Sequence, residues 1–93
     1  MICPGQIYEV VRDVIQEGYG IPVFKIVPGR YYRSDFGMDI KVGERFILDR
    51  QLKVPEIPFD VHPSVNQWRI LHWTGVWRIS ELDIKYNCCL IGV

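Results

Sequence analysis

Two periodicities of apolar residues divide the chain, a helical one near the start and an alternating one near the end. Within residues 6–17 the apolar positions are 7, 10, 11, 14 and 15, and polar residues occupy most of the positions between them. This 3.6-residue spacing predicts a helix over about 6–17, bounded by Pro4 and Gly18. The stretch is also rich in β-branched residues, which leaves open an all-β barrel with residues 6–15 as its first strand.

Short apolar runs bounded by turn residues predict strands in the middle of the chain. The run 21–27 ends at Pro28-Gly29, a dipeptide suited to a tight turn, and 44–50 forms a second such run. Three prolines follow within residues 54–63, and each lacks a backbone donor. We expect that stretch to be an extended, ordered connection that packs over the core.

The clearest alternation lies between Trp68 and Ser80. A two-residue turn at Thr74-Gly75 would pair His72 with Trp77. Cross-strand partners share a face, so the predicted core face carries Trp68, Ile70, His72, Trp77 and Ile79. The opposite face then carries Arg69, Leu71, Trp73, Val76, Arg78 and Ser80.

A short capped turn follows this hairpin. The sequence Ser80-Glu81-Leu82-Asp83 has the spacing of a helix start, and residues 84–86 are expected to begin a last strand. We therefore predict a mainly β, α+β fold: a small antiparallel barrel with one N-terminal helix.

The order of these elements has a familiar form over about residues 41–86. It consists of V-G-E-R-F-I-L, a long irregular loop, W-R-I-L-H-W, a tight T-G turn, V-W-R-I and S-E-L-D-I. This order resembles the SH3-like small β-barrels. The resemblance implies an aromatic-lined groove for extended proline-rich peptides. Residues 6–33 lie outside it, unless they supply the first strand and 44–50 the second.

Composition sets the class of the protein. The 93 residues, 48% hydrophobic and 24% charged, are typical of one globular domain, which we assign to residues 1–93. No apolar run approaches the roughly 20 residues that cross a bilayer, and no secretory signal is visible at the N-terminus. Three cysteines do not form an even disulfide framework. We expect a cytoplasmic protein that does not bind membranes.

Charge suggests one candidate surface. The formal net charge is zero, yet residues 25–53 hold seven basic against four acidic residues. Within this band, Arg30, Tyr31, Tyr32 and Arg33 interleave bases with aromatic rings, as surfaces for single-stranded nucleic acid do. Half-buried tyrosines beside solvated arginines are the more ordinary interpretation.

Trp73 is the second candidate. On the outer face of the predicted hairpin it lies beside Arg69 and Arg78, and Trp, Tyr and Arg are enriched among the anchors of protein interfaces. Cross-strand cover is the more common role of such a tryptophan.

No residues form a recognisable catalytic, metal or cofactor motif. His72 could act as a base, but a core histidine is far more common and no nucleophile accompanies it. Adjacent Cys88 and Cys89 would point to opposite faces of a strand. We therefore expect no enzyme activity, no metal and no cofactor.

The sequence favours a non-catalytic interaction module or accessory subunit whose partner is another protein. We also consider a phage or mobile-element origin. The alternative is a nucleic-acid-binding small β-barrel that uses the basic and aromatic band 25–53. The predicted partner-binding residues are Arg30, Tyr31, Tyr32, Arg33, Arg69, Trp73 and Arg78.

Overall fold

Short runs of β-branched and aromatic residues form most of the protein. The computed structural model describes residues 1–14, 19–26, 36–53, 56–58 and 61–93. One helix, α1 (Glu81–Asn87), accompanies the strands β1 (Ile7–Val10), β2 (Ile21–Phe24), β3 (Phe36–Ile40), β4 (Arg45–Gln51), β5 (Gln67–His72), β6 (Gly75–Ser80) and β7 (Cys88–Gly92). The mainly β character predicted from the sequence is confirmed.

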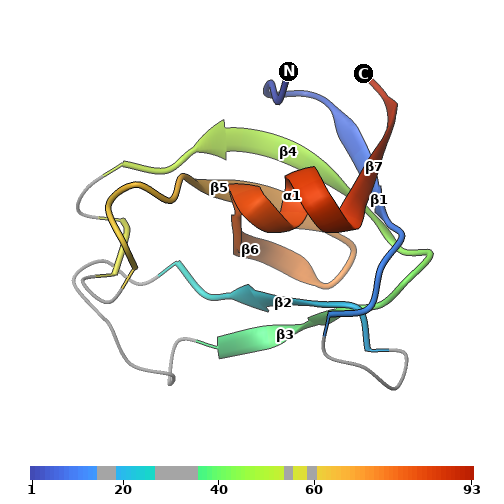
Figure 1. The fold of residues 1–93 in the computed structure, drawn as a ribbon, viewed down its shortest axis with the longest axis horizontal. Helices are drawn as coiled ribbons and strands as arrows, with labels where there is room; N and C mark the ends of the chain where they lie inside the picture. Colours follow the sequence, from blue (N-terminus) through green and yellow to red (C-terminus); the bar gives the residue numbers. More distant parts are fainter. Residues whose placement is uncertain (15–18, 27–35, 54–55, 59–60) are drawn as a thin grey trace.

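The strands form one antiparallel sheet in the order β3-β2-β6-β5-β4-β1-β7. The sheet curls, so that the β2–β3 hairpin lies opposite β4 and β5 (Figure 1). Among the described residues β3 and β7 do not pair, and the sheet is therefore open.

The concave side of the sheet holds the core. Alternate residues of each strand point inward, as the two-residue period of a strand requires. The core cluster comprises Tyr8, Val10, Ile21, Val23, Ile40, Phe46, Leu48, Trp68, Ile70, Ile79 and Ile84. Ile84 is contributed by α1, so the helix packs its single buried residue against this cluster.

The predicted helix over about 6–17 is wrong for residues 7–10, which form β1. This strand pairs with β4 on one side and with β7 on the other. The apolar pair at positions 10 and 11 suggested a helix, but it marks the end of the strand, where the Val11 backbone N–H donates to the Asn87 carbonyl. The alternative of a first strand is correct for this segment, and residues 15–17 lie outside the described residues.

The β5–β6 hairpin keeps the predicted faces but shifts the register. His72 pairs with Gly75, so the turn residues are Trp73 and Thr74, and Ile70 faces Trp77. The Thr74 hydroxyl lies 2.7 Å from His72 Nδ1 and accepts the Trp77 indole N–H at 2.9 Å. A shift of two residues conserves the side-chain parity, so the predicted inward residues remain inward.

The helix α1 is longer than the predicted single turn. The Ser80 hydroxyl caps it by accepting the Leu82 backbone N–H at 3.2 Å, as the sequence indicated. The Asp83 carboxylate accepts the Asn87 side-chain amide, one turn later, at 3.0 Å. Residues 84–86 are therefore helical, and the last strand starts at Cys88.

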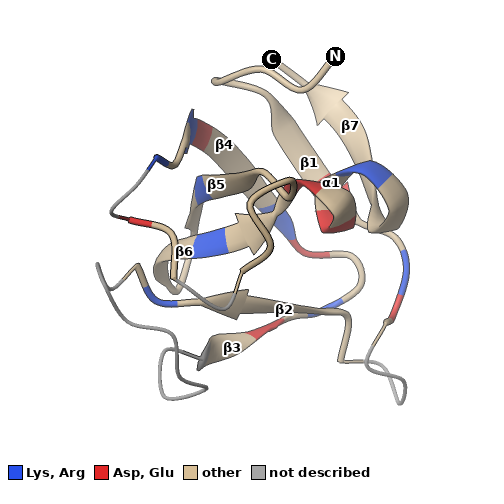
Figure 2. Cartoon of the chain, turned by 60° about the vertical axis from the view of Figure 1, so that its left-hand side comes forward, with Lys and Arg blue, Asp and Glu red and all other residues tan. Residues whose placement is uncertain are grey.

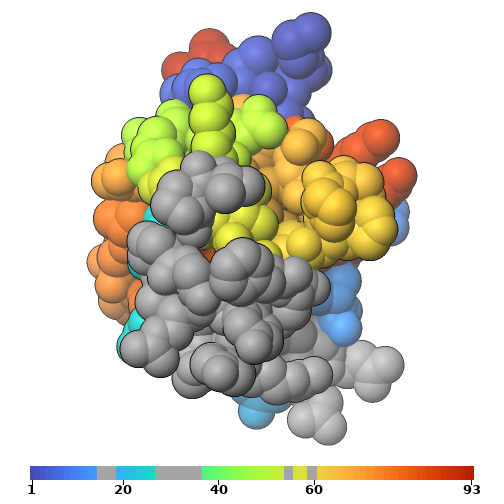
Figure 3. Space-filling model, turned by 90° about the vertical axis from the view of Figure 1, so that its left-hand side faces the viewer, coloured from blue at the N-terminus to red at the C-terminus, as the bar shows by residue number. Residues whose placement is uncertain are grey.

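The connection between β4 and β5 lies on the protein surface next to β4 in its described part (Figure 3). The Arg50 guanidinium holds the Glu56 carboxylate through two hydrogen bonds of 2.7 and 2.8 Å. Further hydrogen bonds hold this connection, donated by the backbone N–H groups of Leu52, Glu56 and Val65. In its described residues the connection agrees with the prediction for 54–63, whereas 54–55 and 59–60 lie outside the described residues.

Two glycines, Gly20 just before β2 and Gly37 in β3, lie very close to other parts of the chain. Gly20 has a φ of 89°, and a Cβ atom there would lie 1.9 Å from the Ile40 carbonyl oxygen. A Cβ atom on Gly37 would lie 2.4 Å from the Trp77 ring. At Gly20 only glycine fits without a shift of the backbone, and at Gly37 a larger residue would displace the Trp77 ring.

In the described part of the chain, none of the helices has the length and apolar character needed to cross a membrane.

Candidate interaction surface

The outer face of the sheet carries a row of apolar side chains across four strands. Backbone pairing sets Ile7 opposite Ile47, Ile47 opposite Leu71, and Leu71 opposite Val76. These four residues, the outer apolar row, belong to β1, β4, β5 and β6 in turn. Ile47 and Val76 are 43% and 44% exposed, and Ile7 and Leu71 are half-buried.

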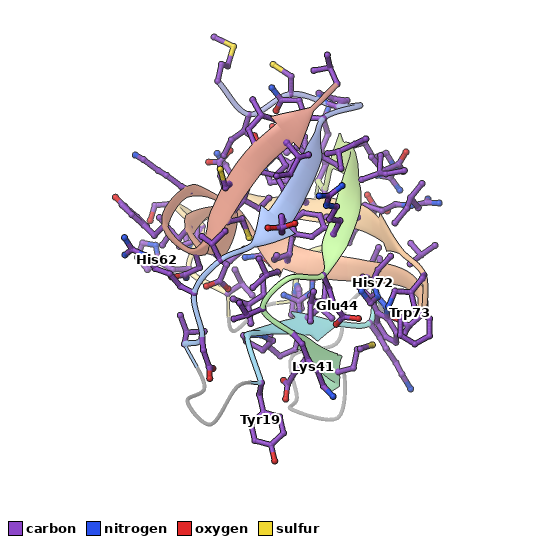
Figure 4. All side chains as sticks on the ribbon, turned by 90° about the vertical axis from the view of Figure 1, so that its right-hand side faces the viewer. Tyr19, Lys41, Glu44, His62, His72 and Trp73 are labelled. Atoms are coloured by element: carbon purple, nitrogen blue, oxygen red, sulfur yellow. The ribbon has the colours of Figure 1, made fainter. Side chains whose placement is uncertain are left out.

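Trp73 lies at the end of β5 beside this row and is 80% exposed. Its indole N–H donates to Glu44 Oε2 at 2.8 Å, and its ring centroid is 5.5 Å from that of His72. Figure 4 shows Glu44, His72 and Trp73 gathered at the turn. The hydrogen bond holds the large ring in place although most of its surface meets solvent.

Three residues of the row and Trp73 border a shallow, open depression. Its volume is about 420 Å³, and it is lined by Ile7, Arg45, Phe46, Ile47, Leu71, His72 and Trp73. The lining is mainly apolar, which suits contact with an apolar side chain more than chemistry on a substrate.

Glu44 is the anchor of Trp73. Its second carboxylate oxygen accepts the Lys41 backbone N–H at 2.8 Å. Burial acts to raise the pKa of Glu44, but the hydrogen bonds from Trp73 and Lys41, with the electrostatic influence of the nearby His72 and Lys41 side chains, outweigh burial and lower it. The carboxylate is therefore ionised at neutral pH, and its charge strengthens both of the hydrogen bonds that it accepts.

His72 lies on the inner face of the sheet and contacts the turn residue Thr74. Its side chain is fully buried, and Nε2 lies 3.7 Å from Glu44 Oε2. Burial lowers the pKa of His72, opposed by the neighbouring Glu44 carboxylate. The ring is consequently neutral at pH 7 and acts as a core residue, as the sequence predicted.

Ion pairs flank the row on both sides. Arg45 Nε lies 3.0 Å from a Glu9 carboxylate oxygen, and Arg69 Nε lies 3.0 Å from Asp49 Oδ2. The charges of each flank cancel locally. The surface is therefore apolar in its centre and close to neutral at its rim.

Arg78 occupies a different environment from the predicted one. It is 4% exposed, so the prediction that its side chain lies on an exposed face is wrong. Its Nη1 donates to Gln67 Oε1 at 3.0 Å, and its Cζ lies 4.8 Å from the centroid of the Phe24 ring. Because β2 pairs with β6 at Phe24, the Phe24 ring lies against the Arg78 side chain on the same face of the sheet.

The other predicted partner-binding residues fall into two groups, those that the structure describes and those that it does not. Arg69 and Trp73 both belong to the outer side of the β5–β6 hairpin, whereas Arg30, Tyr31, Tyr32 and Arg33 lie outside the described residues. In the described part of the basic band, Arg45 and Arg50 are each paired with a glutamate. Sequence reasoning missed Ile7, Ile47 and Glu44, because the run Phe46-Ile47-Leu48 gives no sign of which residue points outward.

No protein-family model, curated protein or solved structure shows a detectable match to this chain. Within the described residues, no group of three or more His, Cys, Asp or Glu side chains is arranged to hold a metal ion.

Proposed function

We propose that this protein is a non-catalytic interaction module or accessory subunit, and that the outer apolar row together with Trp73 is its protein-binding surface. The observation that carries the proposal is the exposed, anchored indole of Trp73. An aromatic ring already held in place loses little conformational entropy when a partner covers it.

The neighbouring side chains strengthen this argument. Single exposed apolar residues are ordinary on protein surfaces, whereas contiguous ones mark binding sites. Here Ile47 and Val76 continue the apolar surface away from Trp73 and are close to half exposed. Neutral ion pairs at the rim would favour a partner with an apolar centre and a polar border.

An SH3-like architecture is part of this proposal. It is supported by the order of the elements after β1: β4, a long connection, the tight β5–β6 hairpin, α1 and β7. The β2–β3 hairpin would then be an elaboration between the first two strands. An extended proline-rich segment is the ligand class that this architecture implies.

A cytoplasmic location also belongs to the proposal. Cys3, Cys88 and Cys89 are all free thiols, as expected in a reducing compartment.

Affinity capture from the cell that encodes the protein tests the binding surface, followed by titration of the purified captured protein. We expect Trp73→Ala to weaken binding about 30-fold or more, since an interface anchor contributes at least about 2 kcal/mol. Tyr86→Ala is the matched control, because Tyr86 is 57% exposed on α1 and neither belongs to the row nor lines the depression. Its affinity should equal that of the wild type.

The same titration should include a proline-rich peptide and oligonucleotides at two salt concentrations. Binding of nucleic acid that weakens steeply with salt, with no effect of Trp73→Ala, would replace this proposal by the alternative that uses the 25–53 band. Equal loss of partner binding in both variants would also contradict it.

A further inference from the structure

The two edges of the sheet differ in how they are protected. One edge is β3, which contains Asp39, and the other is β7, whose five residues include neither a charge nor a proline. Figure 2 shows the acidic segment on β3 and the uncharged ribbon of β7. Natural edge strands are commonly protected by charges or prolines against pairing with another chain. β7 has neither form of protection.

β7 is also accessible. Among the described residues it pairs with β1 alone, and Figure 4 shows it outermost beside β1 and β4. Leu90 and Ile91 are 48% and 44% exposed, and Cys89 is exposed as well. The backbone groups on the outer side of such a strand can pair only with solvent or with another strand.

We propose that β7 pairs antiparallel with β7 of a second copy of this chain, which joins the two sheets across a two-fold axis. The inference goes beyond the proposed function, because it uses a different surface from Trp73.

The strand's composition favours a second copy as the occupant. Antiparallel pairing of a strand with itself sets like residues close to each other, so a charged strand would repel its copy. With the axis at Leu90, Cys89 would face Ile91 of the other copy, and no charges would meet. The same pairing of β3 would bring two copies of Asp39 together. Because a two-fold interface uses the same patch on both copies, the assembly closes at a dimer.

The helix next to β7 offers further apolar area. Leu82 and Tyr86, one turn apart on α1, are 49% and 57% exposed, and α1 runs directly into β7. A strand of five residues alone buries less than the roughly 800 Å² per partner of a typical stable interface. We therefore expect a reversible dimer whose population depends on concentration.

Sedimentation equilibrium from about 1 µM to about 1 mM tests the proposal, a range that covers weak dimers. The wild type should shift from monomer to dimer with concentration. Ile91→Lys should remain monomeric, because it places two like charges in the paired edge. The matched control is Val42→Lys, since Val42 is 47% exposed in the turn between β3 and β4. It should dimerise as the wild type does.

A cross-link at Cys89 gives a second readout in Cys3→Ser protein. Diagonal neighbours across an antiparallel pair lie about 7–8 Å apart, so a short bis-maleimide should join the two Cys89 side chains. Burial, with the nearby Asp83 charge, raises the pKa of Cys88 to about 12, which keeps that thiol protonated and unreactive. We expect a cross-linked dimer that Ile91→Lys abolishes. Two results would overturn the proposal. The first is a wild type that stays monomeric over the whole concentration range. The second is an Ile91→Lys variant that still forms a dimer in sedimentation but gives no cross-linked product at Cys89.

Discussion

The two faces of β4 and β5 are built from similar apolar residues but have different surroundings. On the inner face Phe46 is 2% exposed and Leu48 is fully buried, whereas Ile47 between them is 43% exposed on the outer face. Inner residues contribute their free energy to folding. Outer residues retain apolar surface that a partner can cover. The difference teaches that hydrophobicity alone does not separate core from binding surface.

The largest expected effect is on the inner face. Phe46→Ala should lower the free energy of unfolding by about 3–5 kcal/mol, because a cavity replaces a fully packed ring. Ile47→Ala should change it by no more than about 1 kcal/mol, the span of strand propensities. Urea denaturation of both variants measures the difference. Similar losses in the two variants would mean that the outer face is as important for folding as the core.

Arg69 and Arg78 are paired across β5 and β6, and they give a second comparison within the outer face. Arg78→Ala should cost about 2–3 kcal/mol, because it removes a buried charged hydrogen bond to Gln67 and the contact with the Phe24 ring. Arg69→Ala should cost less than about 1 kcal/mol, since its ion pair with Asp49 is about one-third exposed. Thermal unfolding of both variants measures the difference. Equal costs would mean that the buried contacts of Arg78 with Gln67 and Phe24 add no more stability than the partly exposed ion pair of Arg69.

A smaller effect distinguishes His72 from its exposed neighbour Trp73. Because burial lowers the pKa of His72, the unfolded chain binds the proton more tightly than the folded protein does. Stability should be fully present above the unfolded value of about 6.5 and fall as the pH drops through that value towards the folded pKa.

Melting temperatures between pH 7.5 and pH 5.5 measure this slope. His72→Gln should reduce this slope, whereas Trp73→Ala should retain it. A slope that is unchanged in His72→Gln would show that His72 does not carry the pH dependence.

Part of the fold and of the candidate site was predictable from local pattern. The alternation from Trp68 to Ile79 assigned the inward side chains correctly even though the predicted turn was displaced by one residue, because a two-residue slip conserves side-chain parity. The Ser80 cap was likewise visible in the sequence. The exposed position of Trp73 followed from the same alternation.

Other features were outside the reach of local pattern. The apolar spacing of residues 7–15 fits a helix, yet β1 is a strand because it pairs with β4 and β7, which lie far away in the sequence. Long-range pairing of this kind overrides local periodicity. Glu44 could not be identified as the anchor of Trp73 either, since 29 residues separate the two.

The sequence by itself determined a small β-rich fold, the two faces of the β5–β6 hairpin and the exposure of Trp73, because side-chain alternation is a property of each strand alone. The tertiary structure decided which part of the outer face remained open. It buried Arg78, with its guanidinium over the Phe24 ring of β2, and it aligned Ile7 and Ile47 with Leu71 and Val76. Both outcomes depend on which strands become neighbours, and only the packing of the whole chain sets that order.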